Sequence, residues 1–188
     1  MRARPHGRWI SRLSSRRAGT PIYISRWAWW WARTNGLAAG WTYLYRAVDG
    51  RGATVEFYLS GTRDVAAAKL FLRKAMAEKS IMPPVLMVTD GNPTYPIAVR
   101  EMQREEKLPG SCKLRCSHSE NNLIDQDHRG IQRRADAKQH FRSFGGASHT
   151  IAGYEAMHML RKGQVRECKR GDAVGQAQFV DSLLIAAA

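Results

Sequence analysis

The chain has 188 residues, a formal net charge of +14 and a pI near 10.3. This length can form one domain with a hydrophobic core, and the strong positive charge favours a polyanionic partner, most often DNA, over an ordinary basic protein. Three cysteines form no disulfide framework, which suits a reducing cytoplasm, and no stretch approaches the ~18 apolar residues of a membrane span, so we expect no membrane partner.

Residues 1–40 differ in composition from the rest of the chain. All six tryptophans lie at or before Trp41, no acidic residue precedes Asp49, and no lysine precedes Lys69. One interpretation is an arginine- and tryptophan-rich arm that contacts phosphates and stacks on bases. The other is a poorly ordered segment that was never selected to fold, such as a frameshifted start. We favour the second, because the hydrophobic periodicity is poor and the change in composition is abrupt.

The following residues have the pattern of an α/β domain. Residues 42–48 and 54–60 are rich in β-branched and aromatic side chains and flank the turn sequence Asp49-Gly50-Arg51-Gly52, which predicts a β-hairpin. The apolar run 85–88, bounded by prolines, predicts a short strand buried on both faces, and a second short strand is predicted near 112–118. Periodicity predicts helices over residues 63–79, 95–107, 123–138 and 147–161.

Two aspartates stand where strand and helix ends are predicted. Asp90 directly follows the strand 85–88, and Asn121 or Asn122 can cap a helix whose first turn carries Asp125. Such carboxylates can converge on divalent cations, and two-metal phosphoryl-transfer sites hold two cations roughly 4 Å apart in this way. Asp90 and Asp125 are therefore candidate catalytic, metal-binding residues, although position alone favours a turn or capping role for Asp90.

Four collinear segments resemble a family of bacterial transposases. They are Tyr43–Asp49, Thr89–Asp90, Asn121–Arg129 and Ala156–Gln164. In order and spacing they resemble the insertion-sequence-six family of the DDE (Asp-Asp-Glu) superfamily. The resemblance runs from about residue 41 to residue 165. It implies an RNase H-like α/β fold, a mixed sheet with flanking helices, and DNA strand transfer that depends on Mg²⁺, with Mn²⁺ as a substitute ion.

The resemblance also implies roles for single residues. Asp90 matches the second carboxylate of the catalytic triad, and Asp125 stands where the family has glutamate. Aspartate is one methylene shorter, roughly 1.5 Å less reach, so weakened activity is expected from this position alone. The predicted DNA-binding residues are Asn122, His128, Arg129 and Arg133. Asp127 is interpreted as a solvated helix charge.

The first carboxylate of the triad has no counterpart. The family places an Asp-Glu-Thr-Tyr strand about ten residues before the position of Trp41, where this chain has Trp31-Ala32-Arg33-Thr34. The first catalytic strand is therefore expected to be degraded or absent. The helix-turn-helix region that family members use to bind transposon ends is also not found in this sequence.

We interpret the chain as a transposase that is truncated or frameshifted at its N-terminus. It comprises an atypical segment 1–40, a catalytic domain 41–165 and a tail 166–188. Its expected partners are insertion-sequence ends and target DNA, with a second copy or an intact transposase, at the nucleoid of a bacterial cytoplasm. We expect no strand transfer by the isolated chain. The alternatives are a non-catalytic DNA-binding or dimerising remnant and, ranked last, an RNase H-like nuclease of another role.

Overall fold

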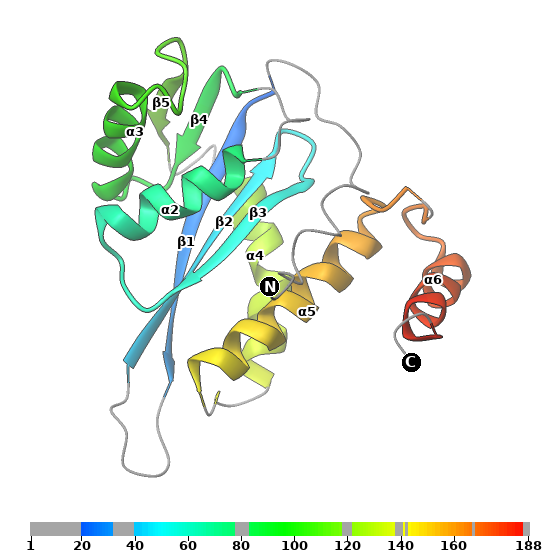
Figure 1. Cartoon of the computed structure of the whole chain (residues 1–188). Helices are drawn as coiled ribbons and strands as arrows, with labels where there is room; N and C mark the ends of the chain where they lie inside the picture. The colour runs from blue at the N-terminus through cyan, green and yellow to red at the C-terminus, as the bar shows by residue number, and fades with distance from the viewer. Residues whose placement is uncertain are drawn as a thin grey trace, which may run out of the picture.

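The protein forms a five-stranded mixed sheet with helices on both faces (Figure 1). The computed structural model describes residues 20–31, 40–77, 83–117, 122–137, 141, 143–166 and 168–185. The strands are β1 (Ile22–Trp31), β2 (Gly40–Asp49), β3 (Thr54–Ser60), β4 (Leu86–Thr89) and β5 (Lys113–Cys116). The helices are α2 (Val65–Met76), α3 (Thr94–Arg104), α4 (Asn122–Ala137), α5 (Phe144–Arg161) and α6 (Ala173–Ile185).

The strand order is β3-β2-β1-β4-β5. The first three strands form an antiparallel meander, whereas β4 pairs parallel to β1 and β5 pairs parallel to β4. A meander extended by parallel strands that enter through helical crossovers is the RNase H-like arrangement. The predicted α/β fold, a mixed sheet with flanking helices, is confirmed.

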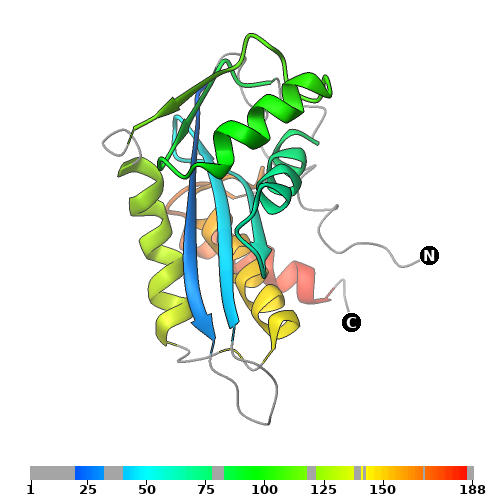
Figure 2. The ribbon, with the colours of Figure 1, turned by 90° about the vertical axis from the view of Figure 1, so that its left-hand side faces the viewer.

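Two hydrophobic cores lie on opposite faces of the sheet. Helices α2 and α3 cover one face, where Phe71, Tyr45 and Tyr95 are fully buried. Helices α4 and α5 lie on the other face, where Leu44 packs with Ile131 and Ile151 (Figure 2). Because successive residues of a strand point to opposite faces, β2 contributes Tyr45 to one core and Leu44 to the other. Strand β2 therefore packs against both helix layers.

The first strand is present, so the expectation that it is absent is wrong, although the strand carries no carboxylate. Ile22–Trp31 forms β1, the central strand, and Ile22 and Ile24 are buried in the core beneath α2 and α3. Residues 1–19 and 32–39 of the atypical segment lie outside the described part of the chain. The strand was not recognised in the sequence because the alternation of a half-buried strand is limited to Ile22, Ile24 and their neighbours, and tryptophans follow them.

The helix ends follow from local chemistry. Asp64 precedes α2 and its side chain accepts a hydrogen bond from the backbone N–H of Ala67 at 2.8 Å, and Ser143 caps α5 through Gly146 at 3.0 Å. Beyond α5, Phe179 and Val180 of α6 pack on a small cluster around Leu160. None of the helices in the described ranges has the length and apolar character needed to cross a bilayer.

The Ile24→Ala variant tests whether β1 belongs to the folded core. Ile24 is 1% exposed, so its truncation is expected to lower the free energy of unfolding by about 2–5 kcal/mol in urea denaturation. Val85→Ala is the control, since Val85 is 52% exposed and its truncation is expected to change stability by less than about 0.5 kcal/mol. Equal stability of both variants would show that β1 contributes nothing to the core.

Candidate active site

Asp90 lies at the carboxyl end of β4, beside the central strand. Its Oδ2 accepts a hydrogen bond from the backbone N–H of Arg26 on β1 at 3.3 Å, and its Oδ1 accepts one from the N–H of Asn92 at 3.2 Å. The side chain is half-buried. Asp90 thus closes the end of the β1–β4 ladder and starts the turn into α3, which is the structural role that the sequence left open.

The sheet register shows which residue stands next to Asp90. On β1 and β4, Tyr23 pairs with Val88 and Ile24 with Thr89, so one further step places Asp90 beside Ser25. Ser25 is 3% exposed and is the cross-strand partner of Arg46, whose side chain points toward α4 and α5. Directly opposed residues project from the same face. The position beside Asp90 on the α4 side is therefore occupied by a buried serine.

This position differs from the one that counting along the chain predicted. The family spacing of about ten residues before Trp41 placed the first carboxylate at residues 31–34. In the structure β1 and β2 pair over ten residues, and Trp31 opposes Gly40 at the far end from Asp90. The missing carboxylate is still missing, because no acidic residue occurs before Asp49.

Asp125 reaches the same edge of the sheet from α4. Helix α4 begins at Asn122 and carries Asp125 in its first turn, where the side chain is half-buried. Strand β5 ends beside Thr89, and the N–H of Ser117 donates to the carbonyl of Thr89 at 3.1 Å. Only four residues connect Ser117 to α4, so the first turn of this helix lies near the carboxyl ends of β4 and β5.

The predicted DNA-binding residues divide between two sides of α4. Asn122, Arg129 and Arg133 are exposed. His128 is 1% exposed, on the side of the helix that also buries Ile124 and faces the sheet. The structure does not support His128 as a DNA contact, because its side chain is covered by protein.

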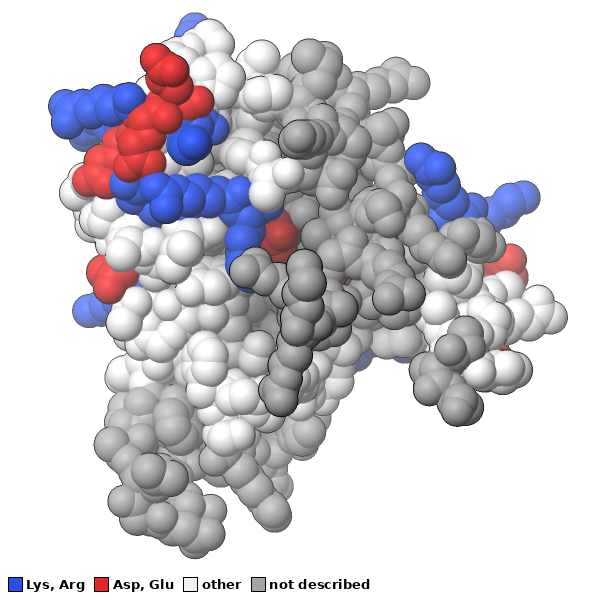
Figure 3. Space-filling view, viewed as in Figure 1, with Lys and Arg blue, Asp and Glu red and all other residues white. Residues whose placement is uncertain are grey.

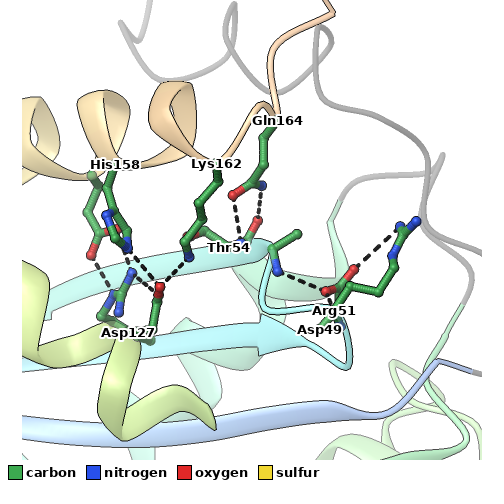
Figure 4. A network of polar contacts seen from close by, with 10 residues as sticks. Asp49, Arg51, Thr54, Asp127, His158, Lys162 and Gln164 are labelled. Atoms are coloured by element: carbon green, nitrogen blue, oxygen red, sulfur yellow. Dashed lines mark hydrogen bonds and ion pairs between the residues drawn. The ribbon is translucent and has the colours of Figure 1, made fainter. Parts of the chain in front are cut away.

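A buried ionic network fixes α4 and α5 to the sheet (Figure 4). Arg46 of β2 is fully buried; its Nε lies 2.5 Å from Glu155 Oε1 of α5, and its Nη2 lies 2.8 Å from Asp127 Oδ2 of α4. Asp127 Oδ1 in turn accepts from His158 Nε2 at 2.7 Å and lies 2.5 Å from Lys162 Nζ. Three segments far apart in sequence therefore meet at one guanidinium.

Asp127 is a central member of this network, so its interpretation as a solvated helix charge is wrong. Its side chain is 10% exposed. Burial alone would raise the pKa of Asp127, but the hydrogen bond from His158 and the charges of Arg46 and Lys162 outweigh it and lower the pKa. Burial also lowers the pKa of Lys162, although Asp127 opposes this. The network holds its charges by pairing them inside the protein.

A polar clamp extends the network to the turn between β2 and β3. Gln164 accepts from the N–H of Thr54 at 2.8 Å and donates to the carbonyl of Thr54 at 2.9 Å. Asp49 accepts from the N–H groups of Arg51 and Ala53 and so shapes the turn (Figure 4). The sequence placed Asp49 at a hairpin turn but did not indicate the role of Gln164, although Gln164 lies within one of the four resembling segments.

The residues at the sheet edge do not fit a pair of divalent cations. Both oxygens of Asp90 already accept backbone N–H groups, the adjacent position on β1 is Ser25, and Asp125 is shorter than glutamate. In the described ranges, no three His, Cys, Asp or Glu side chains gather as metal ligands. Two carboxylates at one edge, without a third, leave the site with too few anionic oxygens for two metals.

Comparisons with known proteins agree on one family. The family described as a DDE domain matches residues 36–164. The transposase for insertion sequence-like element IS431mec of Staphylococcus aureus is 34% identical over 122 residues, which are 65% of this chain and 52% of that protein. The transposase for insertion sequence element IS257 in transposon Tn4003, also from Staphylococcus aureus, matches with the same identity and coverage. The chain spans about half the length of these relatives.

Two solved structures align with this chain at low sequence identity. The catalytic core domain of BIV integrase aligns with a TM-score of 0.48 at 11% identity, covering 88% of this chain and 98% of that chain. A chain of the Mos1 strand transfer complex aligns with a TM-score of 0.44 at 12% identity, covering 76% of this chain and 51% of that chain.

The Arg46→Ala variant is expected to be strongly destabilised. It would leave Asp127 and Glu155 buried without their shared cation, which typically costs about 3–5 kcal/mol. Urea denaturation measures the loss. Arg73→Ala is the control, because Arg73 also pairs with a carboxylate, Glu105, but is 47% exposed, so the expected loss is below about 1 kcal/mol. Similar losses in both variants would contradict a special role of the buried network.

Stability is expected to fall as the pH drops through 6.5 because of His128. Burial, and then the charge of Arg46, hold the pKa of His128 well below its ordinary value of 6.5. The unfolded chain binds this proton first, so lowering the pH from 7.5 to 5.5 favours unfolding by about 1.4 kcal/mol. Denaturation across this pH range should show a flatter profile for His128→Gln. The exposed control His149→Gln should retain the wild-type slope.

Proposed function

Because the chain belongs to the insertion-sequence-six family of DDE transposases, we propose that it is a DNA-transposition protein whose own strand-transfer chemistry is impaired. The family match covers more than half of the chain and includes Asp90 and Asp125. Since the chain spans about half the length of its relatives, activity, DNA partners and assembly are part of this proposal. The strong positive charge supports binding to a polyanion.

One observation carries the proposed impairment. The residue beside Asp90 on the central strand is Ser25, which has no charge to offer a cation. The DDE family implies the use of a divalent metal, and we propose Mg²⁺, with Mn²⁺ as its substitute, as the ion of an intact member. In this chain only Asp90 and Asp125 remain as candidate ligands and catalytic residues. Asp90 is engaged with the backbone of both β1 and its own turn.

We propose that DNA lies along the exposed side of α4. Arg129 and Arg133 are one helical turn apart on this helix, and Asn122 is exposed at its start, near the edge that carries Asp90. Side chains four residues apart share a face of a helix, so both guanidinium groups can reach phosphates of one duplex. The buried network behind α4 supports this by holding the helix against the sheet.

The face seen in Figure 3 is less suited to DNA. Charges gather there over α2 and α3, where Lys69 and Arg73 pair with Glu101 and Glu105. Lys69 and Arg73 are neutralised by these carboxylates, which lowers the positive potential of this face. Arg129 and Arg133 form no ion pair among the described residues, and they lie on the helix that carries Asp125, which favours α4 as the DNA-binding surface.

The proposed setting is the bacterial nucleoid, with a second copy or an intact transposase as protein partner. The basic charge equally favours a purely non-catalytic role, in which the chain occupies insertion-sequence ends and interferes with an intact relative. The two roles differ in turnover. An impaired enzyme retains a trace of metal-dependent joining, whereas a remnant binds DNA in a salt-dependent way without turnover.

Binding and joining are tested in one experiment with labelled insertion-sequence-end duplex. The chain is expected to bind with an affinity that falls steeply with salt, and to join far less DNA with Mg²⁺ or Mn²⁺ than an intact relative does. A trace of metal-dependent joining supports the impaired enzyme, and its complete absence supports the non-catalytic remnant. Arg129→Ala with Arg133→Ala should weaken binding and reduce the slope of log K against log salt by about 2, because two phosphate contacts are lost.

The matched control removes the same charge elsewhere. Arg100 and Arg104 are exposed on α3, and replacing both by alanine should leave the slope within about 0.5 of wild type. If both double variants lose binding equally, α4 is not the DNA surface. Efficient Mg²⁺-dependent joining that Asp90→Ala abolishes would refute the proposed impairment.

A further inference from the structure

The hairpin of β1 and β2 extends beyond the rest of the sheet. The two strands pair over their full length, but β4 accompanies β1 only along Ile22–Ile24 and β3 accompanies β2 only from Tyr43 onward. Figure 1 shows both strands continuing past β3 and β4. Only the last three residue pairs, from Trp29–Thr42 to Trp31–Gly40, have no further described strand beside them, and at about 3.3 Å per residue they carry this two-stranded part about 10 Å beyond β3.

One face of this hairpin is covered by α2 and α3 near Tyr45 and becomes exposed toward Trp41. Tyr45 and Tyr43 point into the core beneath α2 and α3, and by strand alternation Trp41 lies on the same face. Their exposed fractions rise from 0% to 9% to 50% in that order. The cross-strand partners of Tyr45 and Tyr43 are Arg26 and Ala28, and Ala28 is exposed. We call Arg26, Ala28, Trp41 and Tyr43 the hairpin strip.

The hairpin strip combines a cation with aromatic rings. The guanidinium of Arg26 stands over the ring of Tyr43, 5.5 Å from its centroid, and the exposed indole of Trp41 follows two residues away on the same strand face. No acidic residue occurs before Asp49, so neither β1 nor the start of β2 repels an anion. Proteins bind single-stranded nucleic acids with such combinations, because aromatic side chains stack on bases and arginine contacts phosphates.

The hairpin strip begins at the candidate active edge. The backbone N–H of Arg26 donates to Asp90, so the first residue of the hairpin strip contacts the residue that matches the family's second carboxylate. A DNA strand that separates from its duplex at this edge would meet Arg26 and then Trp41. A closed duplex keeps its bases stacked inside and presents no face to an indole.

We propose that the hairpin strip binds unpaired bases of a DNA strand, an inference that rests on the DNA binding proposed above. Arg26 contacts the phosphate backbone and Trp41 stacks on a base. The arginine- and tryptophan-rich composition of this part of the chain then has a function that is independent of the missing carboxylate.

The test follows two signals in one titration of the full chain with fluorescein-labelled oligothymidine. Anisotropy of the label reports binding, and tryptophan emission reports the N-terminal part alone, because all six tryptophans lie at or before Trp41. We expect saturable quenching of the emission as the anisotropy rises. Trp41→Ala should weaken binding about 5- to 100-fold, and Trp41→Phe should restore most of it because a phenyl ring still stacks.

The control and the adverse outcomes separate this inference from the proposed function. Leu184→Ala removes a comparably exposed apolar side chain, 65% exposed on α6, and should bind like wild type. Rising anisotropy without quenching, or unchanged affinity of Trp41→Ala, would refute the binding of bases by the hairpin strip, while the proposed DNA binding by the chain would remain. Binding of duplex without any binding of oligothymidine would do the same. Unchanged anisotropy with both DNAs would overturn the proposed function as well.

Discussion

The structure depends on one buried cation. Arg46 sits between the sheet and two helices without contact to water, and a buried guanidinium is tolerated only when anions neutralise it from close by. Asp127 and Glu155 supply that charge from α4 and α5, which ties both helices to β2 at fixed positions. The first turn of α4, with Asp125, is then held near the edge that carries Asp90. The geometry of the candidate site is therefore a consequence of ion pairing in the core.

Much of the domain could be predicted because its elements are locally consistent. The hairpin of β2 and β3, the four helices α2 to α5, the short strand β4 and the placement of Asp90 and Asp125 at element ends follow from periodicity, turn residues and caps. Three features could not be predicted. Strand β1 is marked by two buried isoleucines among tryptophans, and the burial of Asp127 and of His128 depends on Arg46, about 80 residues earlier in the chain. Ion pairs across such distances leave no periodic signal.

The segments that resemble the family describe its architecture more than its chemistry. They contain Arg46, Asp127, His158, Lys162 and Gln164, whose contacts join β2, α4 and the end of α5. Asp90 bears on both the fold and the proposed chemistry. It matches a carboxylate of the family's triad, and it also accepts backbone N–H groups at the end of the β1–β4 ladder. The fold of the family is thus maintained by Arg46, Asp127 and their partners, and it does not require a carboxylate on β1.

The central position of β1 has a consequence for how the protein folds as it is synthesised. The pairs β2–β3 and β4–β5 join into one sheet only through β1, which leaves the ribosome before all other strands. Its antiparallel partner follows soon, but its parallel partner β4 is about 65 residues further along the chain. Until β4 emerges, the nascent meander exposes the open edge of β1, which invites pairing with another chain. Translation starting after Trp31 would produce two half-sheets with four exposed edges, where the full chain has one continuous sheet with two edges.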